Sequence, residues 1–108
     1  MTTRVMVCYG QPDDPAAFDK HYESVHIPLA SKIPGLLDYT WGKCSGMGGD
    51  SPYYGVAQLE FESPEAMAAG LGSPEMEAAG ADVPNFASGG ATLFIAEQTS
   101  VLVRDGGS

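Results

Sequence analysis

Apolar residues recur at helical spacing in the segment from residue 14 to residue 35, around which the rest of the chain is organised. Phe18, Tyr22, Val25 and Leu29 lie at positions i, i+4, i+7 and i+11. This spacing predicts one amphipathic helix with an apolar stripe along one face. His26 follows Tyr22 by four residues, so the two side chains are predicted to be neighbours at the border of the buried stripe.

The ends of this helix are also indicated by the sequence. Asp14 is a suitable N-cap, and Pro15 falls at the first helical position, where a missing N–H costs nothing. Pro28 disfavours helical geometry at the residue before it, so we expect an end or a kink of the helix close to His26. Residues 33–35, with the sequence IPG, stop the helix at about residue 32.

Alternating or continuous apolar runs elsewhere predict four strands. Residues 4–9 are apolar on both faces. In residues 36–45 we expect Leu37, Tyr39 and Trp41 on one face, and in residues 53–61 Tyr53 shares a face with Ala57, Leu59 and Phe61. The glycine-rich segment 46–52 joins these two strands as a hairpin. Residues 91–103 form the last strand, in which a break is expected near Gln98 and Thr99.

Two short helices are predicted between the third and fourth strands. Each begins with the sequence Ser-Pro-Glu, at residues 63–65 and at residues 73–75, which supplies an N-cap, a proline at the first position and an acid in the first turn. The helices are expected at about 64–70 and 74–82, and residues 84–90 are expected to form a loop.

The resulting order is strand, helix, strand, strand, helices, strand. It indicates an α+β protein of the ferredoxin-like βαββαβ type, with an antiparallel four-stranded sheet and helices on one face. Residues 1–108 are predicted to form a single domain, with a core at about 4–103 and a flexible tail at 104–108. The second face of the sheet would be left uncovered, so we expect a two-fold homodimer that packs sheet against sheet.

Charge and composition narrow the function. The net charge is −9, and no Lys/Arg cluster is present, which argues against nucleic-acid binding and against attachment to anionic membranes. No apolar stretch is long enough to span a membrane, and no signal peptide is expected. The two cysteines, Cys8 and Cys44, form no metal or redox motif, and buried thiols in a cytoplasmic protein are the expectation.

His26 is the strongest candidate for chemistry, because a histidine can donate or accept a proton near neutral pH. Tyr22 is placed to hydrogen-bond either His26 or a substrate. The alternative for His26 is a structural role at the edge of the core. His21 is expected at the surface or in an interface, because it would lie about 140° from His26 on a regular helix. Glu23 and His26 form a Glu-x-x-His pair, but the other ligands of a metal site are missing, so no metal is predicted.

Several segments resemble the EthD family. They are the run HIPLA at residues 26–30, the run SPYY at 51–54 and the run PNFASGG at 84–90, within a similarity that covers residues 4 to 97. The family is similar in fold to the dimeric α+β barrel proteins, whose members include cofactor-free monooxygenases, isomerases and small polyketide cyclases. The resemblance therefore implies a pocket for a hydrophobic small molecule between sheet and helices, and no cofactor.

Aromatic and polar residues that could line such a pocket are Tyr9, Trp41, Tyr54, Asn85, Phe86 and Phe94. For each aromatic residue, packing in the core is the alternative role. The leading hypothesis is a small enzyme that acts on an aromatic or polyketide-like molecule by cyclisation, isomerisation or oxygenation, with His26 as general acid/base and Tyr22 beside it. The alternatives are a binding or accessory protein without chemistry of its own, and a purely structural dimer.

Overall fold

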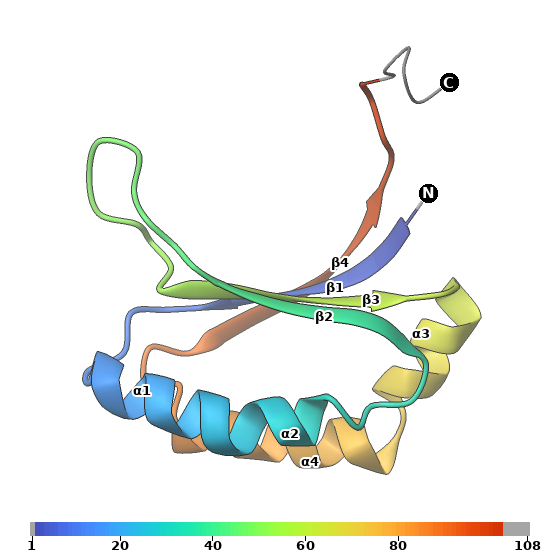
Figure 1. The fold of residues 1–108 in the computed structure, drawn as a ribbon, viewed down its shortest axis with the longest axis horizontal. Helices are drawn as coiled ribbons and strands as arrows, with labels where there is room; N and C mark the ends of the chain where they lie inside the picture. Colours follow the sequence, from blue (N-terminus) through green and yellow to red (C-terminus); the bar gives the residue numbers. More distant parts are fainter. Residues whose placement is uncertain (1, 103–108) are drawn as a thin grey trace.

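A four-stranded antiparallel sheet is covered on one face by helices in this computed structural model, which describes residues 2–102 (Figure 1). The strands lie in the order β2-β3-β1-β4, so that the first and third strands form the centre. Their bounds are Thr2–Tyr9 for β1, Leu36–Lys43 for β2, Gly55–Phe61 for β3 and Ala91–Gln98 for β4. The predicted α+β, ferredoxin-like order of elements is confirmed.

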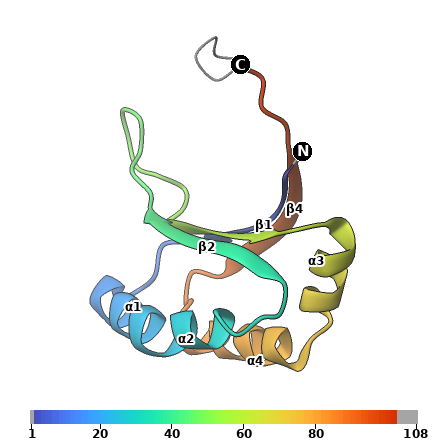
Figure 2. The same cartoon turned by 45° about the vertical axis from the view of Figure 1, so that its right-hand side comes forward.

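The helical layer consists of one long irregular helix and two shorter helices. The long helix is divided into α1 (Pro15–His21), a π-helical segment η1 (Tyr22–His26) and α2 (Ile27–Ala30). The other helices are α3 (Pro64–Leu71) and α4 (Pro74–Asp82), and α4 continues into a 3₁₀ turn, η2 (Val83–Asn85), where only a loop was predicted. Figure 2 shows that α2 and α4 lie side by side beneath the sheet. No helix among residues 2–102 is long and apolar enough to cross a membrane.

The three predicted N-caps are formed as expected. The side chains of Asp14, Ser63 and Ser73 each accept a hydrogen bond from the amide three residues later, at 3.2, 3.0 and 3.1 Å. In each case a proline occupies the next position. These caps satisfy amides that have no partner within the helix, so the start of each helix is determined by local sequence.

The core lies between the helices and one face of the central strands. Val5 and Val7 of β1 alternate with half-buried residues, Cys8 and Tyr9 are both buried, and β3 alternates along its whole length. Antiparallel pairing places Val7 opposite Ala57 and Val5 opposite Leu59, so the buried residues of both strands share one face. Phe18, Tyr22, Ile33 and Met67 are among the helix-side residues that pack onto it.

The predicted stripe on the long helix is wrong beyond Tyr22. Val25 is 40% exposed, whereas His26 and Ala30 are buried. The reason is the π-helical segment, in which the amide of Ile27 bonds to the carbonyl of Tyr22, five residues earlier. A π turn contains more residues than an α turn, so residues four positions apart stay on the same face of this helix. The buried positions are therefore 18, 22, 26 and 30, and His26 lies within the stripe rather than at its border.

Two predictions about strand faces are also wrong. A register shift between Leu36 and Asp38 places Leu36 toward the core and leaves Leu37 59% exposed. The third strand begins at Gly55 rather than at Tyr53, and the Tyr53 side chain is exposed.

The first strand begins two residues earlier than predicted, at Thr2, and the last strand ends at Gln98, where a break was expected. Residue 103 and the predicted tail at 104–108 lie outside the described residues. In Figure 1 the β2–β3 connection and the segment after β4 both rise on the face of the sheet that is turned away from the helices.

Candidate functional site

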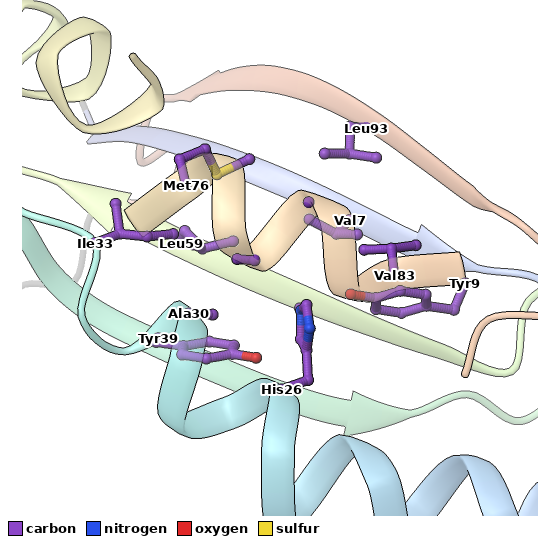
Figure 3. A pocket seen from close by; sticks show the side chains of 13 residues that line it. Val7, Tyr9, His26, Ala30, Ile33, Tyr39, Leu59, Met76, Val83 and Leu93 are labelled. Atoms are coloured by element: carbon purple, nitrogen blue, oxygen red, sulfur yellow. The ribbon is translucent and has the colours of Figure 1, made fainter. Parts of the chain in front are cut away.

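A cavity of about 40 Å³ lies between the helices and the sheet. Its walls are mainly apolar, and they come from all four strands and from the helices α2 and α4. Figure 3 shows Tyr9, Tyr39 and Leu59 on the sheet side, with His26, Met76 and Val83 on the helix side. A space of this size holds only a few water-sized atoms, so a larger ligand requires movement of a wall.

His26 is the one histidine that lines this cavity. Its side chain is almost fully buried, and its Nδ1 lies 3.1 Å from Oδ2 of Asp82. The Nε2 atom makes no hydrogen bond with any residue in the described range 2–102. In Figure 3 the ring rises from its helix toward the space between Tyr9 and Tyr39. The hydrogen-bonded edge therefore faces Asp82, and the other edge is available to a ligand.

Asp82 is the hub of the polar groups around this site. It is the last residue of α4 and is 6% exposed. Oδ1 accepts a hydrogen bond from Nδ2 of Asn85 at 3.1 Å and lies 2.8 Å from Nε2 of His21, while Oδ2 faces His26. A negative charge at the C-terminal end of a helix is unfavourable, and these three partners offset that cost.

The environment favours an ionised carboxylate beside a neutral imidazole. Burial opposes the charge of Asp82, but hydrogen bonds from Asn85, His21 and His26 outweigh it and hold the pKa of Asp82 below its ordinary value. Burial lowers the pKa of His26, and the hydrogen bond to Asp82 opposes that change only in part. A carboxylate can only accept, so this network assigns the proton of the neutral ring to Nδ1 and leaves a lone pair on Nε2.

His21 is predicted to lie at the surface or in an interface; within this chain it is only partly exposed, and a place in an interface stays a prediction. His21 is half-buried, binds Asp82 and stacks on Phe86 with a ring separation of 5.4 Å. The predicted angle of 140° between His21 and His26 assumed a regular α-helix. The π-helical segment turns the two residues toward the same side, so they share one carboxylate. No group of three or more His, Cys, Asp or Glu within residues 2–102 is arranged to hold a metal ion.

Tyr22 lies behind the cavity rather than on its wall. Its hydroxyl is 2.5 Å from that of Tyr39, and its ring packs 4.2 Å from Trp41 and 5.3 Å from His26. The hydrogen-bond partner of His26 is Asp82 rather than Tyr22. Burial raises the pKa of Tyr22, and the bond to Tyr39 adds to this, while burial also raises the pKa of Tyr39. Both phenols are therefore protonated at neutral pH, and a catalytic role of Tyr22 stays a prediction.

The candidate pocket residues are distributed over different places. Tyr9 lines the cavity. Trp41, Tyr54 and Phe86 pack around Phe18 with ring separations of 5.8, 5.0 and 5.1 Å, and Phe86 also lies 4.7 Å from the ring of His26. These three residues form the aromatic support beside the cavity.

Asn85 and Phe94 are not on the cavity wall. Asn85 is exposed and its amide is used by Asp82. Phe94 is half exposed and pairs with Met6 of β1, so it faces away from the helices. It contributes instead to an apolar groove along β4 that also includes Leu71 and Met76 of the helices, and a ligand contact for either Asn85 or Phe94 stays a prediction.

Sequence reasoning missed Asp82 and Tyr39. The signal for Asp82 was present, because an acid in the last turn of a predicted helix opposes the helix dipole and needs a partner. Tyr39 was correctly placed on the same strand face as Trp41, yet it was not named as a pocket residue. Neither residue stands close to His26 in the sequence, since Asp82 is 56 positions away.

The comparisons with known proteins agree with this architecture. Residues 11–90 match the model of the EthD domain. The chain belongs to the EthD family. An uncharacterized 11.0 kDa protein of Rhodococcus erythropolis, from the thcB–thcC intergenic region, is 46% identical over 100 residues, which cover 92% of this chain and 97% of that protein.

Solved structures of other EthD proteins and of more distant proteins share the fold. An EthD family protein from Bacillus halodurans is 34% identical, covers 92% of this chain and 100% of its own, and gives a TM-score of 0.86. A dimeric ferredoxin-like protein of unknown function from Thermobifida fusca is 17% identical, covers 91% and 92% of the two chains, and gives a TM-score of 0.69. The second likeness concerns the fold alone.

Proposed function

We propose that this EthD protein is a small enzyme that transfers a proton on a hydrophobic molecule, with His26 as general acid/base and no cofactor. The observation that carries the proposal is the position of His26. It is buried at the wall of an apolar cavity, with one ring nitrogen on a buried carboxylate and the other nitrogen unused within residues 2–102. This is the arrangement by which a base is oriented and kept in one tautomer.

The protonation state supports the role of base at neutral pH. Burial lowers the pKa of His26, so the ring is neutral and Nε2 can accept a proton. Asp82 stabilises the imidazolium that forms, because its lowered pKa keeps the carboxylate charged. General acid/base catalysis by a positioned histidine is worth about 10²–10⁴-fold.

The apolar walls around His26 favour a hydrophobic substrate. The cavity is small, but it shares Met76 and Leu93 with an apolar groove of about 340 Å³ along β4, which we call the β4 groove. The β4 groove is lined by Val5, Leu71, Met76, Leu93, Phe94 and Ile95. Met76 is flexible and half-buried, so a rotation of its side chain would connect the two spaces. Cyclisation, isomerisation and oxygenation all remain compatible reaction types.

The proposal is tested with a panel of small hydrophobic compounds that carry an acidic C–H bond. Each compound is incubated in D₂O with wild-type protein, and the exchange of hydrogen for deuterium is followed by NMR. We expect at least one compound to exchange faster than in buffer, and we expect His26→Gln to return that rate to the buffer rate. Equal exchange by wild-type and His26→Gln protein would overturn the assignment of His26.

A binding or accessory protein without chemistry is the second candidate, and the small size of the cavity favours it. Such a protein would bind a hydrophobic ligand without exchanging its protons. Ala79 lies buried on the cavity wall, so Ala79→Leu would then abolish binding, while His26→Gln would have little effect. Binding without exchange in the wild-type protein would decide for this second candidate.

We also infer that the chain forms a homodimer in the cytoplasm. Apolar side chains of β4 and of the segment after it are exposed, namely Leu93, Phe94, Ile95, Val101 and Leu102. Proteins rarely leave such a group in water. Relatives of known structure from Thermobifida fusca and Jannaschia are described as dimeric ferredoxin-like proteins. The free thiols of Cys8 and Cys44 accord with a reducing compartment.

A further inference from the structure

Two phenol groups face the cavity of His26, and the proposed proton transfer does not yet use them. Tyr9 comes from the central strand β1, and Tyr39 comes from the edge strand β2. Figure 3 shows their oxygen atoms turned toward the His26 ring from opposite sides. Three polar groups from three different elements therefore converge on a space whose remaining walls are apolar.

Both phenols can offer a hydrogen to a ligand, Tyr9 directly and Tyr39 when Tyr22 donates to it. The hydroxyl of Tyr9 makes no hydrogen bond with a residue in the described range, although its side chain is 1% exposed. Tyr39 shares a single hydrogen bond with Tyr22. Either hydroxyl can be the donor of that bond, and when Tyr22 donates, Tyr39 keeps its own hydrogen for a third group. Burial raises the pKa of Tyr9 and of Tyr39, so both remain donors at neutral pH.

We propose that Tyr9 and Tyr39 bind a carbonyl oxygen, and that the substrate is an apolar ketone or related carbonyl compound with a C–H bond next to the carbonyl group. This inference rests on the proposed role of His26 as the base. Nε2 of His26 removes the proton from the carbon, the C–H electron pair forms a C=C bond to the carbonyl carbon, and the C=O π pair moves to oxygen. The phenols stabilise the resulting enolate, and the imidazolium returns the proton.

The charges around the cavity favour a neutral acceptor over an anion as the ligand's polar group. Lys and Arg are absent from the cavity wall formed by the described residues, and the carboxylate of Asp82 lies directly behind His26. A bound carboxylate or phosphate would be desolvated next to that charge with no cation to balance it. A carbonyl group needs only donors when it binds, and it becomes negative only as the proton leaves, when preorganised donors have their largest effect.

The test compares 2-indanone with indane, which has the same carbon skeleton without the oxygen. Binding of both to the ¹⁵N-labelled full chain is measured by NMR titration, and deuterium exchange into 2-indanone is measured in parallel. Tyr9→Phe and Tyr39→Phe remove the donors but keep the rings. Tyr53→Phe is the matched control, because Tyr53 is exposed and does not line the cavity. The melting temperature of each variant shows whether it folds.

We expect wild-type and Tyr53→Phe proteins to prefer 2-indanone by about tenfold, and each cavity variant to lose that preference. Exchange should fall by about 10²–10³-fold in Tyr39→Phe. Equal affinity for both compounds in the wild type, or no binding of the ketone, would overturn the carbonyl site. The carbonyl site is also overturned if His26→Gln abolishes exchange while both cavity phenol variants exchange at the wild-type rate. If the wild type prefers 2-indanone, the phenol variants lose that preference and no exchange occurs, the carbonyl site is supported and only the role of His26 as base is refuted.

Discussion

At the scale of single residues, the carboxylate of Asp82 contacts two histidines, His21 and His26, that have different environments. Asp82 holds His26 on the cavity wall through Oδ2 and holds half-buried His21 through Oδ1. The two contacts occupy different oxygens, so neither histidine has to leave for the other to bind. His21 and Asn85 thereby fix the orientation of the carboxylate, and the carboxylate in turn fixes the ring of His26.

Replacement of Asp82 by Asn should show whether the carboxylate orients His26 for proton transfer or only stabilises the fold. Asn has nearly the same shape but can no longer fix the Nδ1–H tautomer through a charge, so we expect most of the His26-dependent proton transfer to be lost, within a range of about 10²–10⁴-fold. The readouts are the exchange rate and the NMR signal of the His26 Nδ1 proton. Asp19→Asn is the control, because Asp19 pairs with Lys43 and Tyr54 away from the cavity. An unchanged Nδ1 signal in Asp82→Asn would contradict the assignment.

The lowered pKa of His26 also predicts how stability depends on pH. The unfolded chain protonates this histidine near the ordinary value of 6.5, whereas the folded chain resists protonation until a lower pH. The unfolded state therefore binds more protons in that window, and the free energy of unfolding should fall as the pH drops from about 7 to about 5. Denaturant unfolding at several pH values measures this slope.

His26→Gln should flatten the slope in that range. Asp82 also has a lowered pKa, but its contribution is lost only at more acidic pH, below the ordinary value of 3.8, so the two effects occupy separate windows. A slope of equal size in His26→Gln would show that another group is responsible.

At the scale of elements, the features that could be predicted from the sequence are those that depend on residues close together in the chain. The caps Asp14, Ser63 and Ser73 each act on an amide three residues away, so they could be predicted. The π-helical turn could not be predicted in this way. Its hydrogen bond joins residues five positions apart, and such a turn is retained only when tertiary packing favours it, here by placing His26 against Phe86. The sequence indicated that Asp82 needs a partner, but not which one, since its contact with His26 exists only after α4 packs beside α2.

Two helical glycines provide a test of how closely the elements approach one another. A Cβ on Gly70 of α3 would lie 2.7 Å from both the carbonyl oxygen of Pro34 and the Phe61 ring, whereas a Cβ on Gly80 of α4 would meet nothing within 4 Å. Gly70→Ala should therefore lower the free energy of unfolding by about 1–3 kcal/mol, because α3 is forced away from the sheet. Gly80→Ala should raise it by about 0.5–1 kcal/mol through helix propensity.

Urea denaturation of both variants beside the wild type checks the pair, and each glycine serves as the control for the other. An unchanged or raised free energy of unfolding in Gly70→Ala would mean that the close approach at Gly70 does not restrict the packing of α3.

At the scale of the whole molecule, the two faces of the sheet differ in what covers them. The helix face is covered, whereas the outer face carries the half-buried Met6 and the half-exposed Phe94, which pair across β1 and β4. Arg4, on the same face of β1 as Met6, is already paired with Glu60 at 3.0 Å and hydrogen-bonded to Gln58. Its charge is therefore compensated, and a second copy could cover this face without leaving the guanidinium unpaired.

Phe94→Glu tests whether this face forms the dimer. We expect the wild-type protein to have twice the chain mass of 11.3 kDa in light scattering. A glutamate at position 94 would have to be buried without a partner, so association should weaken by about 100-fold or more and the variant should sediment as a monomer. Val25→Glu is the matched control, because Val25 is also an exposed apolar residue but lies on the long helix. If Phe94→Glu remains dimeric while Val25→Glu becomes monomeric, the helices rather than the outer face of the sheet form the interface.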